Sequence, residues 1–227
     1  MSLTRVKNIT TNLGISQSSP DAELHISATR PHIDIEDTAL GDRAKFGAGY
    51  ANAYIAATST NGQIVFKNGV GSSDFPHASG TTLMNISADG YVTTPLQPAF
   101  NAKSTNAVSI SGTVTLTFNQ VRNNVTSSYN TNGTFTAPIA GWYLFTHKGL
   151  YYAFDNTEYL DLYSYVNGST WNRYEQTGNS GAHTQVNYSE IVYLSANDTF
   201  KLVASNRNIG SFNMYAQENH FSGRLLG

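Results

Sequence analysis

The chain is 227 residues long and 40% of its residues are apolar, which is enough for one sizeable core or two modest ones. Only 12% are charged and the net charge is −2, so the sequence lacks the clustered Lys and Arg that bind a nucleic-acid backbone. The absence of cysteine excludes a disulfide framework, thiolate catalysis and sulfur-bound zinc. We therefore expect stability to come from β-packing or oligomerisation, and we expect no nucleic acid among the partners.

The first segment, residues 1–20, has little hydrophobic periodicity and ends in a Ser-Ser-Pro stop. We interpret it as an attachment segment or loop. Met1 to Lys7 contain no apolar run, and the sequence nowhere has about eighteen consecutive apolar residues. We expect neither a secretion signal nor insertion into a membrane.

Residues 21–97 contain short alternating runs, each bounded by Gly, Asn, Asp or Pro. The runs are Leu24–Ile26, Ile33–Ile35, Tyr54–Ala56, Ile64–Phe66 and Leu83–Ile86. Asn61-Gly62 and Asp89-Gly90 stand between such runs, and both predict hairpins because type I′ turns need residues that tolerate positive φ. This pattern indicates a small β-rich stalk or knob.

The strand pattern strengthens beyond Thr93–Pro98, whose two prolines cannot donate to a sheet ladder and mark a domain boundary. Val114, Leu116 and Phe118 alternate with threonines, as in a half-buried strand. Further strand-sized runs are Gly141–Phe145, Glu158–Tyr165, Gln185–Leu194, Thr199–Ala204 and Phe212–Tyr215, with turns at Asn167-Gly168 and Ala196–Asp198. No convincing helical pattern occurs, so residues 98–227 predict an all-β sandwich or jelly roll.

A series of motifs that begins at Phe118 resembles the signature of C1q domains. The matching residues are Phe118, Asn124, Tyr129, Gly133–Pro138, Gly141–Phe145, Leu194–Asp198 and Phe221–Leu226. The resemblance covers residues 98–227 and implies a C1q/TNF-like jelly-roll sandwich that assembles as a homotrimer. Aromatic residues on both faces of the Gly141–Phe145 run agree with this, because they give more apolar surface than one sandwich interior accommodates.

The spacing departs from the family pattern at one hairpin. Tyr129 and Phe135 are one residue closer than in the family, and His147 occupies a position where an aromatic residue is common. The register of the hairpin between Tyr129 and Phe135 therefore stays open.

Two upstream phrases resemble modules of tailed-phage fibres. They are Leu13–Pro20, followed by Leu24–Ser27, and Met84–Val92. This resemblance implies a fibre-type protein of a virion, on the tail or on the capsid surface, that contacts other virion proteins through its N-terminal segment.

The sequence gives little support for a catalytic or metal site. The histidines, at positions 25, 32, 77, 147, 183 and 220, show no metal-binding spacing, and Gly178–Gly181 has no helix behind it to form a nucleophile elbow. The carboxylates Asp34, Glu36 and Asp37, and likewise Asp155, Glu158 and Asp161, have the character of solvated residues rather than of a glycosidase pair. Asp155–Glu158 could hold calcium but lacks the Asp-x-Asp-x-Asp-Gly pattern. We expect no enzyme activity, no cofactor and no metal.

The aromatic side chains between Tyr151 and Tyr174 leave two interpretations open. Aromatic faces beside Asn and Arg suit sugar rings, and Trp171, Asn172, Arg173 and Tyr174 follow the Asn167-Gly168 turn near a loop end, where receptor contact and packing are equally reasonable. For other ring residues we favour a role in the trimer interface or the core. These are Tyr143, Phe145, His147, Tyr163, Tyr165 and Phe221.

The resulting hypothesis is a homotrimeric virion fibre protein whose C1q-like head binds a host surface glycan or polysaccharide. The alternative is a structural capsid-decoration or collar protein without receptor recognition. A secreted C1q-like protein is disfavoured because neither an export signal nor a collagen repeat is found, and a glycosidase is the enzyme alternative.

Overall fold

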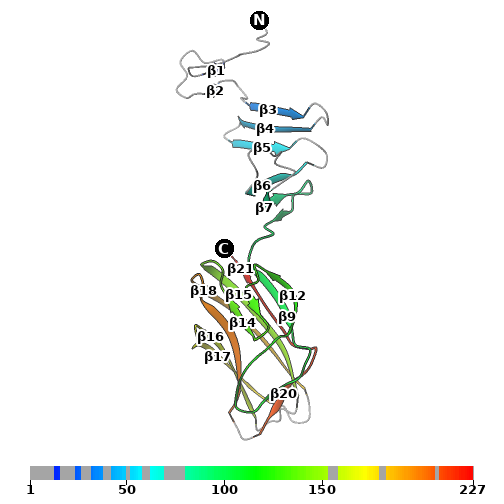
Figure 1. Cartoon of the computed structure of the whole chain (residues 1–227), viewed down its shortest axis with the longest axis vertical. Helices are drawn as coiled ribbons and strands as arrows, with labels where there is room; N and C mark the ends of the chain where they lie inside the picture. The colour runs from blue at the N-terminus through cyan, green and yellow to red at the C-terminus, as the bar shows by residue number, and fades with distance from the viewer. Residues whose placement is uncertain are drawn as a thin grey trace. The chain divides into compact units, whose positions relative to one another are not determined.

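The computed structural model describes most of the C-terminal half of the chain and short segments of the N-terminal half. The described residues are 13–15, 24–26, 32–37, 42–49, 52–57, 62–68, 80–152, 158–178, 183–207 and 210–226. They form strands and turns with no helix among them, which confirms the all-β prediction. The chain divides into two compact units, residues 1–95 and 96–227 (Figure 1), close to the predicted start of the head at residue 98.

The first unit contains three small sheets within its described segments. Their strands are β1 (Leu13–Ile15) and β2 (Leu24–Ile26), which pair in parallel, then β3 (His32–Asp37), β4 (Asp42–Gly49) and β5 (Asn52–Ala57), then β6 (Ile64–Asn68), β7 (Thr81–Ile86) and β8 (Val92–Thr93). Gly90 has a φ of 84° in the turn between β7 and β8, so the hairpin predicted from Asp89-Gly90 is confirmed. Asn61 of the other predicted turn lies outside the described residues.

The second unit, which we call the head, is built from two sheets. The β15 sheet has the order β10 (Val108–Ile110), β20 (Phe212–Met214), β15 (Gly141–Tyr152), β21 (His220–Leu225), β9 (Ala99–Lys103), β12 (Gln120–Val125), with β18 (Thr184–Leu194) paired to β15. The β16 sheet has the order β13 (Tyr129–Asn130), β14 (Thr134–Thr136), β19 (Thr199–Asn206), β16 (Tyr159–Val166), β17 (Ser169–Thr177), with β11 (Thr113–Thr115) paired to β19. The predicted runs thus lie in strands, several of them longer than expected, but the run from Val114 to Phe118 is a strand only as far as Thr115.

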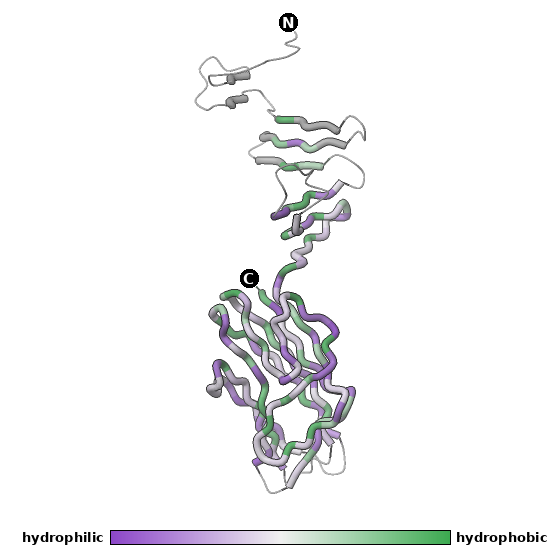
Figure 2. The backbone as a smooth tube through the Cα atoms, in the orientation of Figure 1, coloured by the Kyte–Doolittle hydropathy of each residue, from purple (hydrophilic) through white to green (hydrophobic). Residues whose placement is uncertain are grey.

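Strand alternation builds the core between the two sheets. Along β15, every second residue from Gly141 to Tyr151 is buried, as period-two side-chain direction requires. Figure 2 shows hydrophobic and hydrophilic residues interspersed along the strands of the head. The centre of the core is aromatic: the rings of Phe145 and Phe200 stack with centroids 3.9 Å apart, and Phe221 lies 5.0 Å from Phe100.

Two turns fix the registers of their strands. Asn167 and Gly168 have φ values of 51° and 80°, the positive pair that a type I′ turn needs, and they join β16 to β17 as a hairpin. The hairpin left open by the sequence pairs Tyr129 with Phe135. Gly133 in its turn has a φ of 91°, and a Cβ there would lie 2.1 Å from the Leu116 carbonyl oxygen, so only glycine fits.

Candidate ligand-binding surface

Four of the six ring residues predicted for the interface or core lie inside the sandwich. Tyr143, Phe145, His147 and Phe221 are each at most 2% exposed in a single subunit. They hold the two sheets of one subunit together and are not available to a ligand.

His147 is the polar member of this core. Its Nδ1 lies 2.9 Å from the His220 carbonyl oxygen, which can only accept, so Nδ1 carries the proton and donates. Its Nε2 lies 3.2 Å from the Tyr151 hydroxyl and therefore accepts from it. Burial lowers the pKa of His147 from 6.5 to about 4 and raises the pKa of Tyr151, so both groups are neutral at pH 7.

The outer face of the β15 sheet carries exposed aromatic and aliphatic side chains. Trp142 is 53% exposed and lies in register with Tyr193, with ring centroids 5.5 Å apart. Leu144 pairs with Ile191 in the next register position, and Ile191 is 57% exposed. We call Trp142, Leu144, Ile191 and Tyr193 the outer apolar patch. The aromatic residues on both faces of Gly141–Phe145 predicted an outward-facing Trp142. The sequence did not identify Ile191 and Tyr193 as part of the same surface.

The outer face of the β16 sheet combines tyrosine rings with cations. Tyr159, Tyr163 and Tyr165 alternate along β16, on the face opposite to the buried Leu160 and Leu162. A cationic group lies over each ring. The distances from the cation to the ring centroid are 5.3 Å for Arg207 and Tyr159, 5.9 Å for Arg173 and Tyr163, and 5.6 Å for Lys201 and Tyr165. Distances in this range allow cation–π attraction, so the face presents aromatic and positively charged groups together.

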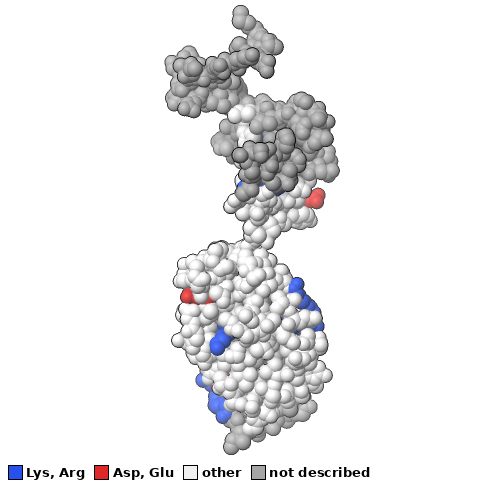
Figure 3. Space-filling model, in the orientation of Figure 1, with Lys and Arg blue, Asp and Glu red and all other residues white. Residues whose placement is uncertain are grey.

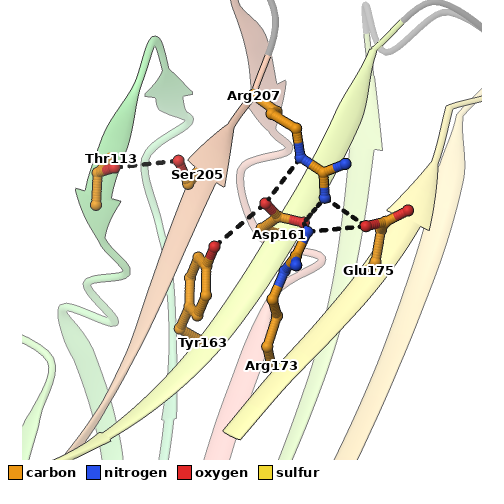
Figure 4. A network of polar contacts seen from close by, with 7 residues as sticks. All are labelled: Thr113, Asp161, Tyr163, Arg173, Glu175, Ser205 and Arg207. Atoms are coloured by element: carbon orange, nitrogen blue, oxygen red, sulfur yellow. Dashed lines mark hydrogen bonds and ion pairs between the residues drawn. The ribbon is translucent and has the colours of Figure 1, made fainter. Parts of the chain in front are cut away.

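Asp161 lies in the same row and joins two of these cations (Figure 4). Its Oδ1 accepts from Arg173 at 2.8 Å and from Arg207 at 2.7 Å, and its Oδ2 accepts from the Tyr163 hydroxyl at 3.2 Å. Both arginines also contact Glu175. The Asp161 side chain is only 5% exposed whereas the guanidinium-bearing side chains are 44% and 43% exposed, so the carboxylate holds the arginines and the arginines face solvent. The expectation that Glu158 and Asp161 are solvated was wrong, because both are buried, and Asp161 serves as a structural anion for two arginines.

Trp171, Asn172, Arg173 and Tyr174 follow the Asn167-Gly168 turn as expected, but they are part of a strand, β17, and not of a loop. The type I′ turn leads directly into β17, which is the edge strand of the β16 sheet among the described strands. Register skips from Asn172 to Thr170, which makes Trp171 the extra residue of a β-bulge and aims it away from the ladder. Trp171 is consequently 60% exposed.

The neighbours of Trp171 face different surroundings. Asn172 donates to Glu190 Oε1 of the edge strand β18 at 3.3 Å, which links the edges of the two sheets. Tyr174 is 36% exposed and its hydroxyl donates to Gln176 at 3.1 Å. Arg173 joins the Asp161 network, so it lies on the same outer face as Tyr163 and Tyr165. The structure thus brings Arg173 together with both predicted tyrosines, while Asn172 points to the open side of the sandwich.

Charged groups are sparse elsewhere on the face of the head that Figure 3 shows, where isolated Lys, Arg, Asp and Glu atoms lie on a mostly uncharged surface. Within the described parts of the chain, no group of three or more His, Asp or Glu side chains could hold a metal ion. Asp155 of the calcium alternative, the loop at 179–182 and the side chains of Asp34, Glu36 and Asp37 lie outside what is described. No helix in the described segments is long and apolar enough to cross a membrane.

Comparisons with known proteins were made for sequence and fold. The structures similar to this chain include the globular domain of zebrafish complement 1qA (16% identity, TM-score 0.46, covering 58% of this chain and 98% of that one). They also include the Eiger TNF of S. frugiperda (13% identity, TM-score 0.47, covering 58% of this chain and 93% of that one). A third is murine APRIL at pH 8.5 (11% identity, TM-score 0.45, covering 57% of this chain and 99% of that one). No curated protein sequence matches. The C1q domain pattern matches residues 99–226, which is more than half of the chain and confirms the expected family, so this chain belongs to the C1q domain family.

Proposed function

We propose that this chain is a homotrimeric fibre-type protein of a virion, and that its C1q-like head binds a host surface glycan through the outer face of the β16 sheet. The observation that carries the proposal is the bulged, 60% exposed Trp171 in the strand that also presents Arg173 beside the Tyr163 ring. The apolar faces of sugar rings stack on aromatic rings, and guanidinium and amide groups bond sugar hydroxyls.

The geometry of this surface is suited to a ligand. The Asp161 carboxylate fixes both arginines from below, so their side chains lose little additional freedom when a ligand binds. Burial, followed by the charge of Asp161, raises the pKa of Tyr163, so its hydroxyl stays protonated. Because an open sheet face makes a shallow site, we expect weak affinity for each subunit.

The proposed trimer multiplies these weak contacts. Domains of the C1q family associate as homotrimers, and the outer apolar patch on the β15 sheet provides a surface for such an association. Three rigidly linked sites convert a weak single contact into useful avidity. The β15 and β16 sheets face opposite sides of the sandwich, so one face is free for subunit contact while the other binds.

The virion context is proposed from the phrases Leu13–Pro20 and Met84–Val92, which resemble phage-fibre modules. In this proposal the segment 1–20 contacts other virion proteins. We propose no catalytic step for this protein and no metal or cofactor. Imaging of labelled particles would distinguish a receptor-binding fibre from a capsid-decoration or collar protein.

The decisive experiment combines Trp171→Ala with Tyr163→Ala, because Tyr163 lies on the outer face in register with Arg173. We expect the variant to keep its sedimentation coefficient and to lose binding to host polysaccharide and adsorption to host cells. Tyr91→Ala is the matched control, because Tyr91 is an aromatic residue 71% exposed in the first unit. Normal adsorption by the double variant would show that this surface is not the receptor site.

A further inference from the structure

The sheet of β3, β4 and β5 has one face that is apolar throughout its described side chains. Ile33, Phe46 and Ile55 lie side by side in register across the three strands, and Ala44 lies beside Ala57. Alternate residues of a strand share a face, so these five residues form one surface, which we call the stalk face. Ile33, Phe46 and Ile55 are 40%, 42% and 55% exposed.

The opposite face of this sheet has a different character. Lys45 and Ala56 occupy it in register, one residue out of phase with Phe46 and Ile55, and both are half-buried. The largest apolar side chains are therefore the exposed ones, whereas the face with the cation is the better covered. This is the reverse of what a small sheet in water needs.

The sheet of β6, β7 and β8 also has an apolar face, although Val65 on its other face is 41% exposed as well. Ile64, Ile86 and Val92 lie in register across its strands, and Phe66 pairs with Met84 on the same face. Phe66 is 45% exposed and Val92 is 60% exposed. Within the described residues, two successive small sheets thus each present an apolar face with partly exposed large side chains.

A three-stranded sheet with one apolar face gains stability only when a second layer covers that face. We propose that the cover is the stalk face of other copies of this chain, so that the first unit is a self-associated shaft whose core is formed by Ile33, Phe46 and Ile55 from each copy. The proposal rests on the trimeric head of the proposed function. It extends that function by placing a second subunit interface in the stalk.

Three observations favour copies of this chain over another partner. The described side chains of this face are all aliphatic or aromatic, so this part of the face is complementary to itself. Two faces need cover, and another copy supplies both in the same order. Each copy of the first unit is also joined directly to a head at residue 96, so head association would hold the stalk faces at high effective concentration.

The absence of cysteine from the chain gives a direct test. In the full chain carrying Ile55→Cys, we expect mild oxidation to produce covalently linked subunits on a denaturing gel, and Phe46→Cys should behave in the same way. Ala56→Cys, one residue along the same strand but on the other face, is the matched control and should remain uncrosslinked. A nitroxide label at position 55 should show restricted motion, because the stalk faces of the other copies cover this otherwise exposed position.

The outcomes separate this inference from the proposed function. Sedimentation of the unmodified chain as a trimer, with cysteines at positions 46 and 55 that do not crosslink and a freely moving label, would overturn the shaft interface alone. Equal crosslinking at positions 55 and 56 would also overturn it. Sedimentation as a monomer would overturn the trimer of the proposed function, and with it this interface.

Discussion

Acid should weaken the head through one buried side chain, His147. The imidazole is 2% exposed, donates to the His220 carbonyl and accepts from the Tyr151 hydroxyl, and burial lowers its pKa from 6.5 to about 4. Above pH 6.5 the ring is neutral in both the folded and the unfolded chain. Between pH 6.5 and 4 the unfolded chain binds the proton first, so acidification favours unfolding.

The size of the effect follows from the two pKa values. Each pKa unit corresponds to about 1.4 kcal/mol, so the fall from 6.5 to about 4 lowers the free energy of unfolding by about 3 kcal/mol over that range. Partial burial, followed by the positive charges of Arg122, Lys148 and Lys103, lowers the pKa of the adjacent His220. A variant at position 147 is therefore needed to separate its contribution from that of His220.

The assay is urea denaturation of the wild type and of His147→Phe at pH 4, 5, 6 and 7, at constant ionic strength and subunit concentration. At pH 7 we expect the variant to be less stable by roughly 1–3 kcal/mol, because the Tyr151 hydroxyl and the His220 carbonyl lose their partner. This difference should shrink by about 3 kcal/mol as the pH falls to 4. His183→Gln, at an exposed position, should keep the wild-type pH dependence. A constant difference between the wild type and His147→Phe across the whole range would refute the reasoning.

Two further substitutions test the core and the outer network. Phe221→Ala removes a fully buried ring that lies 5.0 Å from Phe100 and 5.3 Å from Phe118, and it should cost about 3–5 kcal/mol; an unchanged thermal midpoint would show that the ring does not support the core. Asp161→Asn removes the anion between two arginines and should lower the free energy of unfolding by about 2 kcal/mol, a value reduced by the solvent exposure of the arginines. The same urea titration in low and high salt measures this, and a loss that does not diminish in high salt would contradict an electrostatic origin.

The sequence predicted the parts of the fold that depend on local pattern. Alternation identified β15 and β18, and Asn167-Gly168 identified a hairpin because positive φ is a local requirement. Strand β17 was missed, since it is an edge strand whose residues are nearly all exposed and therefore carry no clean alternation. The sequence therefore placed Trp171 after the turn without placing it in a strand.

The contacts that shape the candidate site could not be predicted, because they join distant parts of the chain. Asp161 and Arg207 are separated by 46 residues and meet only because β16 and β19 are neighbours in the sheet. His147 shares the inward alternation of Phe145, but its acceptor is a carbonyl 73 residues away. The residue types predicted recognition by aromatic and cationic side chains. Which of these side chains share a face depends on the order of the strands in the sheet.

The hydrogen bond between the two turns that follow β16 and β18 makes the head sensitive to chemical ageing. Asn167 Nδ2 donates to Asp198 Oδ1 at 2.8 Å, and this bond, together with that from the Ser195 backbone N–H, lowers the pKa of Asp198 and keeps it ionised at neutral pH. An asparagine followed by glycine is the type most prone to spontaneous deamidation. Loss of the Asn167 amide would replace that donor with a second carboxylate beside Asp198, turning an attraction into a repulsion. In stored protein we therefore expect the contact between these two turns to be lost before other contacts of the head.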